Sequence, residues 1–313
     1  MAAQSPFLIA EIGFNHAGDH ALALEMISAA AKAGADAVKF QTFRASDILH
    51  PSSDYYKTLD EAEFDLDMHK ALADHAQAHN VEFMSTPFSP WALDILEKVG
   101  VQRYKIASMD CTHHPLLKAA AQTKKPLIIS TGMATLDEIK ETEALLLGEG
   151  CKDLTFLHCQ SLYPARAEQL DLSCITKLKQ ELSCRVGYSD HYPGVDACIV
   201  AAMLGAEVIE THFTTDTSIE GGDHAHSADP QALRQLRTTI ELHQAMLGQG
   251  ELTEQRNDIE FASVYRRGVY AAHELKEGAS VTPDDVLFCR PPAALDPNAF
   301  SNNQSFVAKR TID

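Results

Sequence analysis

Two stretches of the sequence have the same design, VGYSDHYPG at residues 186–194 and VIETHFTTD at residues 208–216. Each begins with apolar and β-branched residues and ends in polar residues, as a buried strand followed by a loop does. Each also carries a histidine near its carboxyl end, and His191 and His212 are 212 − 191 = 21 residues apart. We therefore place the two histidines at the ends of consecutive strands.

Six further stretches have this design. They are FLIAEIGFN (7–15), AVKFQTF (37–43), EFMSTPF (82–88), RYKIAS (103–108), PLIISTG (126–132) and TFLHCQS (155–161). Nearly continuous apolar runs are typical of strands that are buried on both faces of a parallel sheet. Helix-length patterns lie between the strands, and TLDE at residues 135–138 predicts a capping box at the start of one helix.

Eight strands that alternate with helices over about 250 residues predict a (β/α)8 TIM barrel. An open doubly wound sheet is the alternative. The G-x-G-x-x-G turn typical of that fold is absent after the first strand. Polar residues follow nearly every strand, which favours the barrel because all eight carboxyl ends then meet at one face.

The sequence divides into a barrel domain at 1–250, a linker at 251–265 and a small β-rich domain at 266–313. The linker is polar and lacks the periodicity of the barrel. The last segment alternates short β-like runs with turn signals. A domain of this size needs a packing partner.

The composition is that of a globular protein, with 45% hydrophobic and 22% charged residues. The absence of an apolar run of about 18 residues argues against a membrane span. The first residues lack the basic n-region of a secretory signal, and the seven cysteines are scattered along the chain. Both features favour a cytoplasmic protein with reduced thiols. The net charge of 26 − 44 = −18 argues against nucleic acid as a partner, and an anionic ligand would need local lysines, arginines or a metal ion.

The polar residues at the predicted strand ends converge on one candidate active site. They are Glu11, Asn15, His16, Lys39, Gln41, Thr86, Lys105, Ser108, Asp110, Ser130, Ser161, Tyr163, Ser189, His191 and His212. Any single serine here could be a helix cap, so only the convergence is informative.

Lys39 and Lys105 lie inside apolar strands, where a lysine needs a partner for its charge. They could bind a phosphate or carboxylate together, or one could be a Schiff-base nucleophile. Lysines that extend to the barrel rim are the alternative. Glu11 and Asp110 could act as bases, as metal ligands or as buried partners of the lysines.

His191 and His212 can direct neutral imidazoles at one divalent ion such as Mn²⁺, Zn²⁺ or Fe²⁺, although each alone is more typical of a hydrogen-bonded core histidine. The stretch GGDHAHSADP (221–230) is suited to a mobile loop over the site, with Asp223 reaching substrate hydroxyls. Its His224 and His226 could instead be a surface pair that binds metal adventitiously.

Nine motifs in this order resemble those of the sialic acid synthase family: AEIGFNHAGD, VKFQTF, STPFS, YKIAS, ISTGM, LHCQSLYP, GYSDH, ETHFT and GGDHAHS. The resemblance covers nearly the whole chain. Members of that family are transferases that condense phosphoenolpyruvate with an N-acetylmannosamine-type sugar, giving a nine-carbon 2-keto-3-deoxy acid and phosphate. They also carry a small antifreeze-like C-terminal domain, which residues 266–313 resemble.

The resemblance implies a role for each matching residue. His191 and His212 would hold Mn²⁺ or Mg²⁺, and Glu11 or Asp110 could activate water at the reacting centre. The residues implied to bind phosphoenolpyruvate are Lys39, Thr86, Lys105, Ser108, Ser130, Ser161 and Ser189. The residues implied to hold the sugar are Gln41, Tyr163, Asp223 and Arg290, the last reaching the partner's site across a domain-swapped homodimer.

The sequence departs from the family at three points. Met109 stands where the family has a glycine, PPAALDPNAF replaces a glycine-containing turn after Arg290, and the C-terminal domain is expected to be truncated. The acceptor sugar stays open among N-acetylmannosamine, its 6-phosphate and 6-deoxy-diacetamido sugars. A metal-free Schiff-base aldolase and a non-catalytic binding protein are the alternative functions.

Overall fold

The computed structural model describes residues 5–248, 250, 257–300 and 306–312. The chain forms two compact units, Met1–Gly248 and Gln249–Asp313. The division falls two residues before the boundary expected from the sequence. Residues 251–256, the first part of the expected linker, lie outside the described residues.

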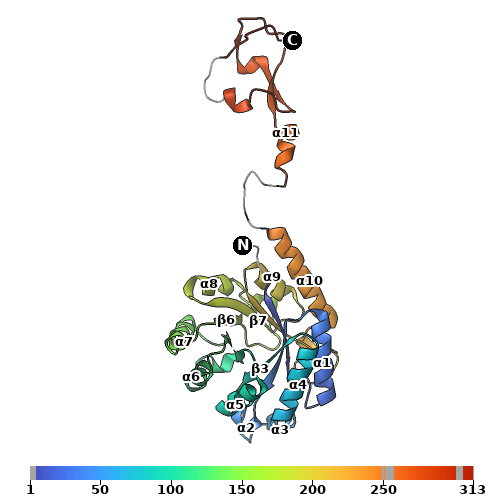
Figure 1. Ribbon diagram of the computed structural model, residues 1–313, viewed down its shortest axis with the longest axis vertical. Coiled ribbons are helices and arrows are strands. Elements are labelled where there is room, and N and C mark those ends of the chain that lie inside the picture. The colour runs from blue at the N-terminus through green and yellow to red at the C-terminus, as the bar shows by residue number, and fades with distance from the viewer. Residues whose placement is uncertain (1–4, 249, 251–256, 301–305, 313) are drawn as a thin grey trace. The chain divides into compact units, whose positions relative to one another are not determined.

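The first unit is the predicted (β/α)8 barrel (Figure 1). Its strands are β1 (Phe7–Gly13), β2 (Ala37–Thr42), β3 (Glu82–Pro87), β4 (Tyr104–Ile106), β5 (Leu127–Ser130), β6 (Leu154–Cys159), β7 (Arg185–Asp190) and β8 (Val208–His212). The hydrogen-bonded order is β3-β2-β1-β8-β7-β6-β5-β4, and every pair is parallel. Residues of β3 and β4 also lie within 8 Å of one another, which closes the barrel. The alternative of an open doubly wound sheet is therefore wrong.

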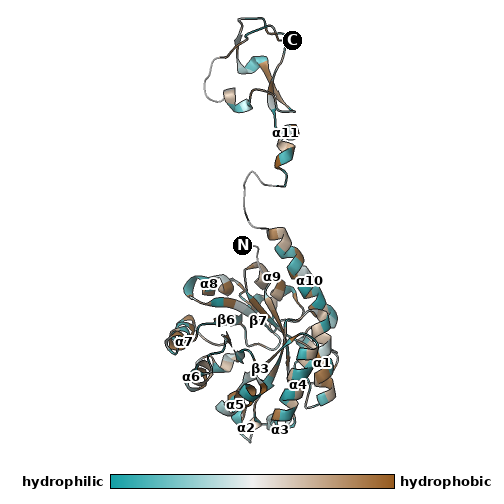
Figure 2. Cartoon of the chain, in the orientation of Figure 1, coloured by the Kyte–Doolittle hydropathy of each residue, from teal (hydrophilic) through white to brown (hydrophobic). Residues whose placement is uncertain are grey.

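Helices surround the strands (Figure 1), and both hydrophobic and hydrophilic residues occur along them (Figure 2). They are α1 (His20–Ala33), α2 (Ala45–Ile48), α3 (Tyr56–Glu61), α4 (Leu66–Ala78), α5 (Pro90–Val99), α6 (His114–Gln122), α7 (Leu136–Gly148), α8 (Ser173–Glu181), α9 (Asp196–Met203) and α10 (Pro230–Leu247). The predicted capping box at the start of α7 is confirmed, since the Thr135 side chain accepts from the backbone N–H of Glu138 while Glu138 accepts from that of Thr135. No helix among the described residues combines the length and hydrophobicity that a membrane span requires.

The barrel interior has an apolar layer followed by a polar one. The apolar layer contains Ile9, Ala37, Met84, Ile128, Leu157 and Val208. Because side chains in a strand alternate between two faces, the residues two positions further along face the same interior. Those residues are Glu11, Lys39, Thr86, Ser130, Cys159 and Glu210. Each of these six strands thus supplies packing at one end of the barrel and polar side chains at the other.

The second unit contains two small antiparallel pairs. They are formed by β9 (Gly268–Ala271) with β11 (Val286–Cys289) and by β10 (Ser280–Val281) with β12 (Phe306–Val307). Helix α11 (Ala262–Tyr265) precedes β9. The β-rich segment expected after residue 266 is therefore present. All seven cysteines lie in the described residues, and none of them is in a disulfide there.

Gly187 in β7 packs closely against β6 and β8 and provides a test of the barrel. A Cβ atom at this position would lie 2.4 Å from the carbonyl oxygen of Val208 and 2.6 Å from Cδ2 of Leu157. We therefore predict that Gly187→Ala lowers the free energy of unfolding by about 1–3 kcal/mol or more, because backbone and core must both shift.

The matched control is Gly148→Ala, at the last residue of α7, where a Cβ meets nothing within 4 Å. Its free energy of unfolding should be unchanged or higher by up to about 1 kcal/mol, because alanine is the better helix former. Urea unfolding of the two variants measures the difference. Equal stability of the two would contradict the packing described for β7.

Candidate active site

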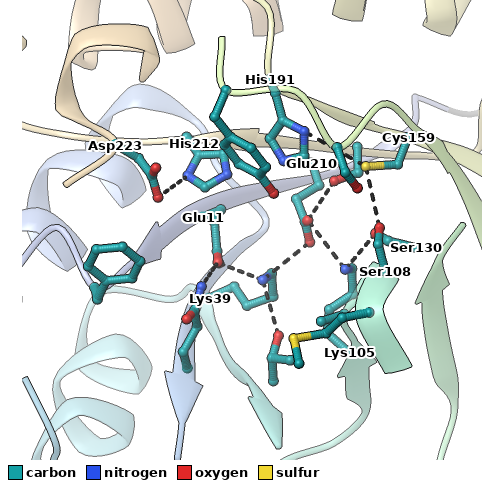
Figure 3. A pocket seen from close by; sticks show the side chains of 18 of the residues that line it. Glu11, Lys39, Lys105, Ser108, Ser130, Cys159, His191, Glu210, His212 and Asp223 are labelled. Carbon is teal, nitrogen blue, oxygen red and sulfur yellow. Dashed lines mark hydrogen bonds and ion pairs between the residues drawn. The ribbon is translucent and has the colours of Figure 1, made fainter. Parts of the chain in front are cut away.

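A cavity of ≈ 490 Å³ opens at the carboxyl ends of the barrel strands (Figure 3). Thirteen residues singled out from the sequence line it: Glu11, Lys39, Gln41, Thr86, Lys105, Ser108, Ser130, Ser161, Tyr163, Ser189, His191, His212 and Asp223. The convergence expected from the strand ends is therefore present in the structure.

Three other candidates from the strand ends are described residues but do not line this cavity. Each of them contacts a different neighbour. The carboxylate of Asp110 is buried, with Oδ1 3.0 Å from Nδ1 of His113. His16 stacks on Phe64 with ring centroids 4.1 Å apart, and burial lowers its pKa to about 4. It is a core histidine.

Asn15, the third, forms hydrogen bonds to the loop that carries Asp223. Its Nδ2 donates to the carbonyl oxygen of Phe213 and to Oγ of Ser227, at 3.0 and 3.1 Å. Its Oδ1 accepts from the backbone N–H of Asp223 at 2.8 Å. A residue after β1 therefore fixes the backbone of the loop after β8, so that the Asp223 carboxylate has a defined place in the cavity.

Two lysines and two glutamates form a continuous ion-pair network in the cavity floor (Figure 3). Lys39 Nζ lies 2.6 Å from Oε2 of Glu11 and 3.6 Å from Oε2 of Glu210, and Lys105 Nζ lies 3.5 Å from Oε1 of Glu210. All four side chains are at most 6% exposed. The lysines thus do not extend to the rim.

Hydroxyl groups complete this network. Lys39 donates to Oγ1 of Thr86 at 3.2 Å, and Lys105 donates to Oγ of Ser130 at 2.7 Å. The Ser189 hydroxyl donates to Oε1 of Glu210 at 2.9 Å. The ammonium groups therefore sit among hydroxyls that can also bind the oxygens of an anion.

Burial and charge act in opposite directions on the pKa values of the four groups. Burial lowers the pKa of Lys39, but attraction to Glu11 and Glu210 outweighs it and the net pKa is raised. Burial dominates at Lys105, where the net pKa is lowered although Glu210 attracts the charge. Burial likewise raises the pKa of Glu11 despite Lys39, whereas at Glu210 the two lysines overcome burial and lower the pKa. Of the two carboxylates in this network, Glu11 therefore accepts a proton more readily than Glu210.

Sequence reasoning missed Glu210, which joins the two lysines. It lies within the apolar run of β8, before the polar end of the strand that drew attention to His212. The signal was present nevertheless, because residues two apart in a strand share a face and Glu210 is in phase with both Val208 and His212. Cys159 enters the cavity in the same way, from β6.

The two histidines lie side by side, with ring centroids 5.2 Å apart (Figure 3). His191 directs Nδ1 at the carbonyl oxygen of Gln160, 2.6 Å away, which leaves its Nε2 available. Burial lowers the pKa of His191 to about 4, and burial together with His191 and His226 lowers the pKa of His212 well below its ordinary value. Both rings are therefore neutral near pH 7, the state that binds metal ions.

His224 and His226 are buried, so the interpretation as a surface pair is wrong. His224 Nδ1 lies 2.7 Å from Oγ1 of Thr214. Asp223 lies between two imidazoles, with Oδ2 3.4 Å from Nδ1 of His212 and Oδ1 3.5 Å from Nε2 of His226. These two nitrogens are buried and have no hydrogen-bond partner among the described residues. Such a donor set fits a divalent cation.

Met109 and Met133 line the mouth of the cavity and are 51% and 74% exposed. Met109 is not among the described non-glycine residues with a positive φ. Its backbone therefore does not need the freedom of the glycine that the sialic acid synthase pattern has at this position. Arg290 lies in the second unit, with its guanidinium carbon 5.3 Å from the ring centroid of Tyr265.

Replacing Glu210 tests the network. We predict that Glu210→Gln lowers the free energy of unfolding by about 3–5 kcal/mol, because it leaves two buried ammonium groups with one carboxylate. As control, Glu82→Gln removes a more exposed partner of Arg103, at 2.8 Å, and should cost at most about 1 kcal/mol. Chemical unfolding of both variants gives the comparison, and a Glu210 variant as stable as the control would contradict this role.

Comparisons with known proteins identify the family of this chain. The NeuB family model matches residues 26–252. An N,N'-diacetyllegionaminic acid synthase of Legionella pneumophila is 38% identical over 95% of this chain and 88% of its own length. A pseudaminic acid synthase of Campylobacter jejuni is 33% identical over 98% and 93%.

A solved structure has the same fold. It is the N-acetylneuraminic acid (sialic acid) synthetase of Leptospira borgpetersenii in complex with citrate, with a TM-score of 0.79 and 36% identity. The match covers 82% of this chain and 90% of that protein. With the family match over most of the barrel and relatives of this similarity, the chain belongs to the NeuB family of sialic acid synthases.

Proposed function

We propose that this protein condenses phosphoenolpyruvate with a 2-acetamido sugar of the N-acetylmannosamine type. The products would be a nine-carbon 2-keto-3-deoxy sugar acid and phosphate. The observation that carries the proposal is the pair of buried lysines among hydroxyls at the carboxyl face of a barrel whose chain has a net charge of −18. Ammonium groups among hydroxyls in the cavity floor give a small anion local partners that the acidic surface of the protein does not offer.

The phosphoenolpyruvate end of the cavity is proposed to lie over this floor. Lys39 and Lys105 would neutralise the phosphate and carboxylate, as point charges already held in place by carboxylates. The hydroxyl groups near them that would bind the remaining oxygens belong to Thr86, Ser108, Ser130, Ser161 and Ser189. The Ser161 hydroxyl is buried and has no partner among the described residues, as expected of a group that waits for a ligand.

The acceptor sugar is proposed to lie next to the histidines. Gln41, Tyr163 and Asp223 line this part of the cavity and offer amide, phenol and carboxylate groups to hydroxyls. The Tyr163 ring lies over His191, with centroids 4.0 Å apart. The three side chains come from different strand ends, so together they can orient an extended open-chain sugar.

The buried Nδ1 of His212, which has no hydrogen-bond partner among the described residues, fits a divalent cation, and we assign the ion to His212 with His191 as the expected second ligand. A bound Mn²⁺ or Mg²⁺ would supply Lewis acidity to the aldehyde of the sugar. Carbon 3 of phosphoenolpyruvate would bond to that aldehyde carbon while the aldehyde oxygen takes up a proton and becomes a hydroxyl. Water would add to carbon 2 and give up a proton, and the bond from carbon 2 to the phosphate oxygen would break, releasing phosphate and leaving the 2-keto group. Glu11, whose pKa burial raises, would take the proton of that water. Asp110 is less suited to this role because its carboxylate faces His113 outside the cavity.

A Schiff-base aldolase is the second candidate, and one observation favours it. Burial lowers the pKa of Lys105, which makes its amine more readily available as a nucleophile. Such an enzyme would need no metal, and borohydride would trap its adduct with pyruvate on the lysine.

One experiment separates the candidates. Phosphate release from phosphoenolpyruvate is measured with Mn²⁺ and a panel of 2-acetamido sugars: N-acetylmannosamine, its 6-phosphate and 6-deoxy-diacetamido sugars. The synthase releases phosphate only with an acceptor and stops with EDTA. The aldolase would instead condense pyruvate with a sugar, in a reaction that survives EDTA and is lost on borohydride treatment. No turnover of either phosphoenolpyruvate or pyruvate with any sugar would leave a binding protein.

His191→Ala should reduce turnover at least about 10²-fold, because the variant removes an imidazole that faces the reacting groups. The fold should be retained, because the side chain ends at the cavity. The control is His113→Ala, which removes a partly exposed histidine outside the cavity and should leave turnover unchanged. Full activity of the His191 variant would remove this residue from the assignment.

We propose further that residues 266–313 form an antifreeze-like domain and that Arg290 completes the sugar site of a second copy in a homodimer. Arg290→Ala should raise KM for the sugar about tenfold or more with a smaller effect on KM for phosphoenolpyruvate. Mixing Arg290→Ala with a His191→Ala chain should restore activity, since one site of the mixed dimer then has both groups. If the mixture gains no activity, Arg290 does not act between copies.

A further inference from the structure

Gly132 lies in the loop after β5, next to Met133 of the cavity mouth, and none of the roles described above belongs to it. It is not among the described glycines with a positive φ, so its φ does not require a glycine. A Cβ atom at this position would nevertheless overlap Oγ of Ser161 and lie 2.8 Å from Oγ of Ser108. The missing side chain therefore leaves room for two hydroxyl groups of the cavity wall.

The Ser108 hydroxyl is oriented by this glycine. The backbone N–H of Gly132 donates to Ser108 Oγ at 3.0 Å, which uses the oxygen as an acceptor and leaves its proton to be donated. Ser108 donates that proton to Sγ of Cys159, 3.6 Å away (Figure 3), and sulfur is a weak acceptor. The Ser108 hydroxyl is therefore ready to donate to a stronger acceptor that enters the cavity.

The Ser161 hydroxyl belongs to the loop after β6 and lies equally close to Gly132. Its oxygen is buried and has no hydrogen-bond partner among the described residues. A buried hydroxyl in this state is unfavourable unless a ligand or water bonds to it. The oxygens of Ser108 and Ser161 both lie within 2.8 Å of the point that a Cβ atom of residue 132 would occupy. They are therefore near neighbours and can reach one group of a ligand together.

A positive charge lies next to these hydroxyls. Ser130, two residues before Gly132, accepts a hydrogen bond from Nζ of Lys105 at 2.7 Å. Ser108, Ser161, Ser130 and Lys105 all line the same cavity. Hydroxyl donors beside an ammonium group are suited to the oxygens of an anion, since hydrogen bonds to charged acceptors are the strong ones.

We propose that Gly132 is a positioning residue for phosphoenolpyruvate, because its missing side chain lets the hydroxyls of Ser108 and Ser161 donate to the same oxyanion of that ligand. The inference rests on the proposed function in taking phosphoenolpyruvate as the ligand. A side chain at residue 132 would displace both hydroxyls. The anion would then keep its attraction to Lys105 but lose two hydrogen bonds.

Binding of phosphoenolpyruvate without a sugar tests this. Phosphoenolpyruvate is titrated calorimetrically into the full-length chain in a buffer that contains Mn²⁺. Gly132→Ala should raise the Kd at least about tenfold, because the added methyl group displaces the two donors. The matched control is Gly148→Ala at the end of α7, where a Cβ atom meets nothing within 4 Å, and its Kd should equal the parent's. A Kd of Gly132→Ala that also equals the parent's overturns the proposal.

A double-mutant cycle separates this contact from a general loss of structure. Ser161→Ala removes the oxygen that a Cβ atom of residue 132 would overlap. Gly132→Ala should therefore raise the Kd by a factor at least about threefold smaller in the Ser161→Ala background than in the parent. Equal factors in the two backgrounds overturn the proposal, because Gly132 then acts independently of Ser161.

Urea unfolding of each variant accompanies the titrations. If Gly132→Ala alone shows no cooperative unfolding transition, its return in the double variant supports the contact with Ser161. A double variant that also lacks the transition overturns the proposal, since the damage then lies elsewhere.

The outcome is separable from that of the sugar assay. A parent chain whose affinity for phosphoenolpyruvate depends on Gly132, but which releases no phosphate with any sugar of the panel, refutes the proposed function and leaves the role of Gly132 standing. A chain that is active with a sugar and whose affinity does not depend on Gly132 refutes that role alone. A parent chain that binds no phosphoenolpyruvate refutes both.

Discussion

The site depends on burying two ammonium groups inside a barrel without leaving either unmatched. Lys39 and Lys105 are each 3% exposed, and the transfer of such charges out of water is unfavourable unless carboxylates and hydroxyls replace the solvent. Glu11 and Glu210 supply the carboxylates, and Glu210 serves both lysines from one strand. The network has two positive and two negative members, so the floor is near neutral until a proton or an anion arrives.

This arrangement follows from strand geometry. The interior residues of β1, β2 and β8 change from Ile9, Ala37 and Val208 to Glu11, Lys39 and Glu210 within two positions. The apolar layer closes the barrel below the charges and keeps water from reaching them on that side. Because neighbouring parallel strands are in register, Glu11 lies opposite Lys39 on one side and His212 on the other. The chemistry is thus assembled from local alternation and from the closing of the sheet.

The alternation of side chains along a strand and the closing of the sheet also determine which residues could be predicted from the sequence. The barrel followed from counting strands, and twelve cavity residues followed from taking the polar residues near the end of each strand, while Asp223 came from the motif after the eighth strand. Glu210 escaped because it stands within an apolar run, where polarity alone does not reveal the direction of a side chain. Asp110 and His16 were included because position after a strand does not say whether a loop turns its side chain inward, and here His113 and Phe64 hold them elsewhere. The burial of His226 depends on the path of the loop after β8, which the periodicity of the sequence does not encode.

The mouth of the barrel is built differently from its floor. Met109 and Met133 stand there largely in solvent, on unbranched thioether chains that adopt many shapes at little cost. Neither methionine takes part in the ion pairs of the lysine and glutamate network beneath. Substitutions at the rim can therefore alter the shape of the cavity mouth while the charged layer stays intact. This scaffold can thus acquire a new substrate selectivity without changes to its reactive centre.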